Sequence, residues 1–175
     1  MADAPRGSHM EDQPAWSDTL VESLARAIHD AYLEAGHAQG KSIATDPSMA
    51  AWDRLPEALR ESSRDQAAHI LDKLEAIGCD VRSAGDRVGS DQFRLKPDEV
   101  EYLAELEHRR WVDERLRNGW VRGPRDPLRK TTPYLVSWSV LSERMRDYDR
   151  MFVRLIPDLL GRQGYRIVRR AHPAG

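Results

Sequence analysis

Two side chains with complementary binding chemistry, Trp111 and Arg115, stand four residues apart in a segment of helical periodicity. Residues at this spacing lie next to each other on one face of a helix. An indole can stack on a purine, which contributes about 1–3 kcal/mol per base. The guanidinium beside it can donate two parallel hydrogen bonds to a phosphate. The pair therefore predicts a site for a ligand that combines a flat ring with an anionic group.

A basic loop follows this pair. Its cations are Arg122, Arg125, Arg129 and Lys130, and its one acid is Asp126. Such an excess of positive charge suits an anionic ligand. We therefore treat Arg122, Arg125 and Lys130 as weaker ligand-binding candidates. The alternative is an ordinary solvated surface loop with no ligand.

Catalytic chemistry finds little support in the sequence. There is no GxSxG sequence, no P-loop and no glycine-rich dinucleotide fingerprint. The single cysteine, Cys79, excludes an internal disulfide and a cysteine-rich zinc site, and it follows a helix-ending glycine, which indicates packing. Asp147 and Asp149 would lie on opposite faces of a helix, in a region that indicates surface ion pairs. We expect no enzyme, no catalytic residue, no cofactor and no metal site.

The elements that must position these residues are mainly helices. Apolar residues at helical spacing predict a first helix over residues 17–35, ended by Gly36 and Gly40. A second runs from Pro56 to Gly78, and a third from residue 97 to 117. A fourth runs from about residue 142 to 164, and a short strand is expected after each hairpin, over residues 80–82 and 166–168. The predicted fold class is all-α with these short strands.

The second half of the sequence repeats the first. Eight residues recur 86 positions later without a gap, as the pairs Pro47/Pro133, Trp52/Trp138, Leu55/Leu141, Glu57/Glu143, Arg60/Arg146, Arg64/Arg150, Leu74/Leu160 and Gly78/Gly164. Upstream the offset is 79, in the pairs Leu24/Leu103, Ala25/Ala104, His29/His108 and Tyr32/Trp111. The repeat predicts two helical hairpins around a pseudo-twofold axis, since one hairpin alone has too little core.

Such an axis would bring Tyr32 and Trp111 face to face as an aromatic clamp for a planar ring. The alternative is that both are core residues of a helix pair. His29 and His108 recur symmetrically and are weaker ligand candidates. No HExxH pattern accompanies them, so a hydrogen bond from each to a loop carbonyl is the favoured role over metal binding.

The second half also resembles the RyR domain, the repeat module of ryanodine receptors that occurs in bacterial proteins as well. The resemblance rests on Leu103-Ala104-Glu105, His108, Trp111, Arg115, Gly119-Trp120, Gly123, Arg125-Asp126, Lys130, Pro133, Leu135-Val136, Trp138, Leu141, Asp149-Arg150 and Gly164-Tyr165. The first half is similar through fewer residues: it lacks the Gly-Trp pair and the basic loop, and Gly36 stands where the second half has Arg115. We expect a first RyR-like repeat over 17–82, a linker over 83–96, a second repeat over 97–169 and a tail over 170–175.

The resemblance implies a non-catalytic regulatory or sensor module that binds an adenine nucleotide or a nucleotide-derived signal between the two repeats. The alternative is a protein-interaction or scaffold domain of a larger assembly. Partners would be a small anionic nucleotide-like ligand and an effector domain or partner protein.

Composition limits the other partners. Lys and Arg total 27 against 29 Asp and Glu, a balance that argues against general nucleic-acid binding. No apolar run approaches the ~18 residues of a membrane span, and no secretory signal is visible, so a cytoplasmic protein is expected. Residues 1–10 look like the remnant of a purification tag, which suggests that the remainder is a piece of a longer protein.

Overall fold

The fold is seen in a computed structural model that describes residues 16–44, 46–85 and 93–171. The expected tag remnant at 1–10 lies outside these residues. The helices are α1 (Asp18–Ala38), α2 (Glu57–Ala68), α3 (Ile70–Ala76), α4 (Pro97–Arg117) and α5 (Glu143–Arg162). The strands are β1 (Cys79–Ser83), β2 (Val121–Arg122), β3 (Thr131–Thr132) and β4 (Tyr165–Arg169), and 3-10 turns are η1 (Pro47–Met49), η2 (Trp52–Arg54) and η3 (Trp138–Val140). The mainly helical fold is confirmed, and the short strands after the two hairpins are present.

The first helix begins as the sequence predicts but runs longer. The Ser17 side chain accepts a hydrogen bond from the backbone N–H of Leu20, which caps the exposed N–H groups at the start of α1. Gly36 does not end the helix; it lies buried inside α1, and a Cβ there would stand 2.5 Å from the Sδ of Met49. The prediction of an end at residue 35 is therefore wrong, because this glycine serves close packing.

The second predicted helix is divided. His69 caps the end of α2 and the start of α3. In the second half, α5 is continuous over the equivalent stretch. Pro97 opens α4 as expected, and α4 ends at Arg117, followed by its C-cap Asn118 and by Gly119 in the left-handed conformation.

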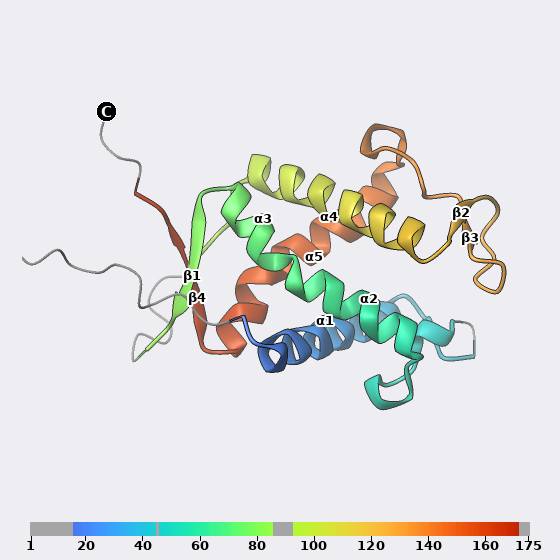
Figure 1. The fold of residues 1–175 in the computed structure, drawn as a ribbon, viewed down its shortest axis with the longest axis horizontal. Helices are drawn as coiled ribbons and strands as arrows, with labels where there is room; N and C mark the ends of the chain where they lie inside the picture. Colours follow the sequence, from blue (N-terminus) through green and yellow to red (C-terminus); the bar gives the residue numbers. More distant parts are fainter. Residues whose placement is uncertain (1–15, 45, 86–92, 172–175) are drawn as a thin grey trace, which may run out of the picture.

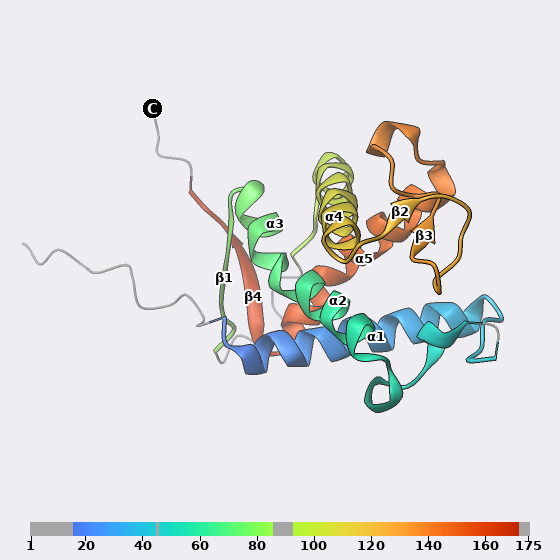
Figure 2. The same ribbon diagram turned by 45° about the vertical axis from the view of Figure 1, so that its right-hand side comes forward.

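Each half is a helical hairpin, and the two hairpins lie against each other. Figure 1 shows that α1 and α4 both run away from the β1–β4 ribbon, whereas α2–α3 and α5 return to it. Within the halves, α1 packs on α2 and α4 packs on α5. Between the halves, α2 packs on α4 and α1 packs on α5 (Figure 2). The loops β2–β3 and η1–η2 gather at the end of the bundle away from the ribbon.

The β1–β4 ribbon joins the two halves with a self-consistent register. The strands are antiparallel, with Val81 opposite Ile167, Cys79 opposite Arg169 and Ser83 opposite Tyr165. When each residue is replaced by the residue 86 positions away in the other half, every pair of the ribbon becomes a pair of the same ribbon; Cys79 and Arg169, for example, become Tyr165 and Ser83. The backbone hydrogen bonds that extend the ribbon obey this rule as well: Ala84 N–H donates to Gly164 C=O, and Arg170 N–H donates to Gly78 C=O, both at 2.8 Å.

One hydrophobic core serves both halves. Its buried members come from α1, α2–α3, α4, α5 and the ribbon, and include Leu24, Ile28, Ile70, Leu74, Val81, Leu103, Val153, Ile156, Leu160 and Ile167. Neither hairpin therefore has a core of its own.

Candidate functional site

The two histidines anchor loops in the same way. The Nε2 of His29 lies 2.8 Å from the carbonyl oxygen of Ala50, and that of His108 lies 2.7 Å from the carbonyl oxygen of Val136. The two acceptors are 86 residues apart, and both rings are buried. The predicted hydrogen bond from each histidine to a loop carbonyl is confirmed, and the Nε2 atoms are thereby engaged within the protein.

The two repeated tryptophans also have matching partners. The indole N–H of Trp52 donates to Glu22 at 3.1 Å, and that of Trp138 donates to Glu101 at 3.2 Å. An arginine 12 residues after each tryptophan closes the arrangement: Arg64 bonds Glu22, and Arg150 bonds Glu101, each at 2.7 Å. Residues related by the offsets of 79 and 86 thus make equivalent contacts, and Trp138 packs against the hydrophobic core.

Trp111 and Arg115 form part of a stack at the end of α4. The ring of Trp111 lies 6.0 Å from His108, nearly parallel to it, and the Arg115 guanidinium carbon lies 5.4 Å from the Trp111 ring centroid. The same guanidinium carbon lies 4.9 Å from Trp120. We call these four residues the arginine stack. The contact between Arg115 and Trp111 confirms the prediction that the two lie next to each other on one helix face. Trp111, Arg115 and Trp120 are all partly exposed.

Arg115 has an internal counter-charge. Its Nη1 lies 3.3 Å from Oε2 of the buried Glu114, and burial lowers the pKa of Arg115. The other Glu114 oxygen accepts a hydrogen bond from Asn118 at 2.7 Å. Oε2 itself has no hydrogen-bond partner among the described residues. The guanidinium thus lies close to two indoles and beside a carboxylate that is incompletely hydrogen-bonded.

Tyr32 stacks on the histidine of its own half. Its ring lies 6.1 Å from His29, and its hydroxyl lies 2.7 Å from Ser48 Oγ. The side chain is 37% exposed, so it is not a core residue. Tyr32 and Trp111 are not among the ring pairs in contact in the described part of the chain. The aromatic clamp of Tyr32 and Trp111 stays a prediction.

Two residues missed by the sequence reasoning join Tyr32. The Lys41 ammonium lies 5.9 Å from the Tyr32 ring and 5.6 Å from the ring of Tyr148, which belongs to α5 of the second half. The Tyr148 hydroxyl donates to Gln39 at 3.2 Å. Lys41 of the first half therefore places a cation over one ring of the predicted clamp.

The basic loop extends toward this group. Arg122, Arg125, Arg129 and Lys130 are exposed, and the Lys130 ammonium donates to the carbonyl of Asn118 at 3.0 Å. Burial opposes ionisation of Asp46, but hydrogen bonds from Ser48 and the charges of Arg125 and Lys41 hold its pKa below the usual value. Arg125 therefore lies within electrostatic reach of the first half.

The first half cannot hold an arginine at the position of Arg115. Gly36 stands there, and Met49 fills the space above it. The presence of Gly36 at the position equivalent to Arg115 is thus explained by packing against Met49. Lys41, placed after the left-handed Gly40, supplies the cation by another route.

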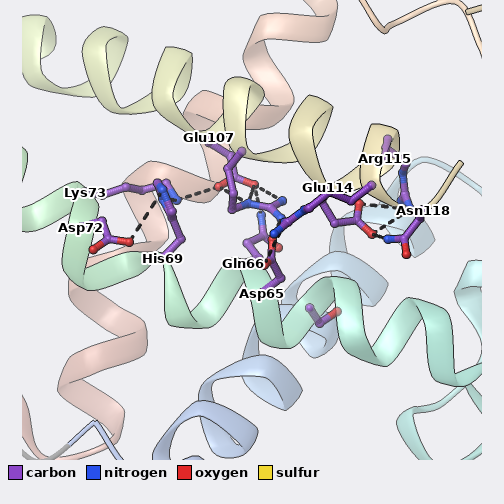
Figure 3. Close-up of polar contacts among 12 residues, drawn as sticks. Asp65, Gln66, His69, Asp72, Lys73, Glu107, Glu114, Arg115 and Asn118 are labelled. Carbon is purple, nitrogen blue, oxygen red and sulfur yellow. Dashed lines mark hydrogen bonds and ion pairs between the residues drawn. The ribbon is translucent and has the colours of Figure 1, made fainter. Parts of the chain in front are cut away.

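A second polar cluster is buried between α2–α3 and α4 (Figure 3). Glu107 forms ion pairs with Lys73 at 2.8 Å and with Arg110 at 2.7 Å, and it accepts a hydrogen bond from Gln66 at 2.8 Å. Arg110 also reaches Asp65 at 2.6 Å. Burial opposes the ionisation of Glu107, but the charges of Arg110 and Lys73 outweigh it and lower its pKa. Burial lowers the pKa of Lys73, and the charge of Arg110 adds to this effect, while Glu107 opposes it.

Asp149 lies beside this cluster on α5. Its Oδ2 stands 3.8 Å from Nδ1 of His108, and burial, followed by the charge of Glu107, raises the pKa of Asp149 to about 8. Asp147 is exposed and pairs with Arg150. The two aspartates lie on opposite faces as predicted, but the interpretation of this region as surface ion pairs fails for Asp149.

The described segments contain no group of three His, Cys, Asp or Glu side chains that could hold a metal ion. No helix in the same segments is long and apolar enough to cross a membrane.

The fold is that of a mainly helical module in which two hairpins share one core and a cation lies over an aromatic ring in each half. Residues 95–169 match the family model of the RyR domain, so this part of the chain is a RyR domain. A RyR domain indicates a regulatory or interaction module in general.

Proposed function

We propose that the chain is a tandem of two RyR repeats related by a pseudo-twofold axis, which binds a small nucleotide-like ligand at the end of the bundle away from the β1–β4 ribbon. The repeat is supported by the matched histidine, tryptophan and arginine contacts and by the ribbon register. The axis would run between α1 and α4 and emerge at that end.

The observation that carries the ligand class is the arginine stack. A partly exposed guanidinium that lies against two indoles is suited to bind a phosphate, and a partly exposed indole is suited to stack on a planar base. Lys41 and Arg125 add positive charge from the two sides of the same end. The ligand class is therefore an anion with a flat ring, such as an adenine nucleotide or a nucleotide-derived signal.

A thermal-shift screen against nucleotides is the first test, because a ligand at 100 times its dissociation constant adds ~2.7 kcal/mol of stability. Calorimetric titration of the best nucleotide then compares three variants. We expect Trp111→Ala to lower affinity about 5- to 150-fold through lost stacking, and Arg115→Ala to cost a similar amount. Arg129→Ala is the matched control, since its side chain is 84% exposed and its charge is screened. Folded Trp111 and Arg115 variants that bind as tightly as the wild type would rule out this site.

We further propose that the module is not an enzyme. Its candidate site offers stacked rings and cations, and the sequence lacks the nucleophile–base and phosphate-loop patterns named above. Incubation with ATP, NAD and cyclic nucleotides, followed by chromatography, should return each compound unchanged. Turnover that a point substitution in this chain abolishes would contradict the proposal.

A scaffold role is the second candidate, favoured by exposed apolar residues at the same end. Leu128 of the basic loop is 97% exposed, Val121 is 56% exposed and Leu116 is 54% exposed. An acidic partner with an apolar recess would suit this surface. If no nucleotide shifts the melting temperature while Leu128→Ser weakens a purified partner's binding, the scaffold role replaces the ligand role.

A further inference from the structure

The two halves meet along two seams that the repeat makes equivalent. In one, α2–α3 packs on α4; in the other, α5 packs on α1. We call the first the ionic seam; its residues are Asp65, Gln66, Lys73, Glu107 and Arg110. The positions equivalent to them, 86 residues later on α5 or 79 residues earlier on α1, are Met151, Phe152, Leu159, Ile28 and Ala31. We call this second set the apolar seam, and every charged or polar residue of the first has an apolar counterpart in it.

The residues that differ between the two seams include deeply buried side chains. Lys73 is fully buried and the Glu107 side chain is 2% exposed. Their counterparts Leu159 and Ile28 are buried in the common core. Equivalent positions of the repeat thus hold an ion pair in one seam and hydrocarbon in the other.

The two seams should respond differently to separation. Opening the apolar seam exposes hydrocarbon to water, at about 25 cal/mol per Å². Opening the ionic seam also exposes part of the common core, such as Ile70 and Leu103. It lets water solvate the ions as well, which offsets much of the lost attraction, and buried ion pairs are often no more stabilising than apolar residues of similar volume. The pairs at its rim, from Arg110 and Arg117 to Asp65, are also open to screening because Asp65 is 35% exposed.

The ionic seam is connected to the arginine stack along α4. Glu107, Arg110 and Glu114 follow one another at helical spacing, and all three are buried. Glu114 makes an ion pair with Arg115. A phosphate that binds Arg115 would compete with Glu114 for the guanidinium, and the buried carboxylate of Glu114 would then lose its counter-charge. Water reaching Glu114 through an opened seam relieves that cost.

We infer that the two seams are unequal parts of one switch: the apolar seam holds the halves together, and the ionic seam opens when an anion binds the arginine stack. The asymmetry between the seams stands on the contacts alone. The link to a ligand rests on the proposed function.

Spin-label distances across both seams test this inference with an internal control. The labels replace the exposed residues Ala68 and Asp113 across the ionic seam, or Arg154 and Glu34, their repeat equivalents, across the apolar seam. The background is the full chain with Cys79→Ala. The two pairs of positions are equivalent, so similar distances are expected in the closed state. We expect about 1 M NaCl, and separately ADP, to give the 68–113 pair a second, longer distance, while the 34–154 pair keeps one.

The outcomes separate the two proposals. If neither salt nor ADP distinguishes the pairs, or if the 34–154 pair opens first, the switch is ruled out. If salt opens only the 68–113 pair and ADP has no effect on it while calorimetry detects no ADP binding, the unequal seams stand and the proposed ligand fails. If ADP binds and the 68–113 distance is unchanged, the ligand link is overturned. The variant Lys73→Leu/Glu107→Ile/Arg110→Ala, which copies the apolar seam, should abolish the longer distance.

Discussion

At the scale of single residues, Asp149 shows how the two halves of the chain differ. Its equivalent in the first half is Ser63, whose hydroxyl donates to the carbonyl of Leu59 in its own helix. Asp149 instead carries a carboxyl group into a buried region beside His108 and near Glu107. A carboxylate there has to lose hydration while facing another negative charge, so the protonated form is favoured.

Asp149 should make stability depend on pH in a defined direction. Its pKa in the fold is about 8, above the value of 3.8 typical of an exposed aspartate. The folded state therefore binds the proton more tightly, and this stability is fully present below the lower value and is lost as pH rises through the higher one. The slope in between is at most ~1.4 kcal/mol per pH unit.

Urea unfolding of the wild type and Asp149→Asn between about pH 5 and pH 8 isolates this contribution. The asparagine cannot ionise, so the variant should gain stability relative to the wild type as pH rises, by ~1 kcal/mol or more over the range. His69, whose pKa burial lowers, is present in both proteins and cancels. A difference between the two proteins that does not change with pH would mean that Asp149 is ionised throughout.

The candidate site could be predicted only in part from residues. Trp111 and Arg115 follow from helical spacing, because the spacing fixes their common face. Lys41 follows a left-handed glycine in a loop, and no periodicity indicates where such a side chain points. Lys73 and Glu107 lie on different helices, so their burial depends on tertiary packing, and each charge alone would indicate a solvated surface.

At the scale of elements, the ends of the hairpins have a common design. Gly78 follows α3 and Gly164 follows α5, with φ of 70° and 79°. This left-handed conformation turns the chain into β1 and β4, and glycine adopts it without a Cβ clash. Such glycines are visible in the sequence, which explains why the hairpin ends and the strands could be predicted. The division at His69 could not, since neither proline nor glycine marks it.

Gly78→Ala and Gly164→Ala should each destabilise the protein by ~1–2 kcal/mol. A Cβ at either position meets nothing within 4 Å, so the cost is conformational and should be similar for the two. Denaturant unfolding of both variants gives the comparison. Gly161→Ala, inside α5 with equally open surroundings, is the control and should be neutral or stabilising. A large cost at only one of the two glycines would argue against equivalent ribbon ends.

At the scale of the whole molecule, the shared core explains why two hairpins occur in one chain. The ribbon pairs one strand from each half, and both seams bury residues of both halves. A helix pair separated from its partner would expose these surfaces to water. The offsets of 86 and 79 indicate this architecture before any coordinates are known, because they keep core positions in register. To predict the different chemistry of the two seams, one must also know which helix faces meet.

Fragments divided between the halves should therefore depend on each other for folding. We expect the chain ending at Gly85 and the chain beginning at Phe93 to be largely unfolded when separate, because each loses half of the core and its ribbon partner. Mixed in equal amounts, they should recover helical circular dichroism and a cooperative transition, with a midpoint that rises with concentration since association is now bimolecular. A mixture with Val81→Asp in the first fragment is the control, because Val81 is fully buried at the centre of the ribbon. Its failure to recover structure would assign the recovery to the native interface. A second fragment that folds cooperatively by itself would show instead that the RyR domain at residues 95–169 has an independent core, contrary to the single core seen here.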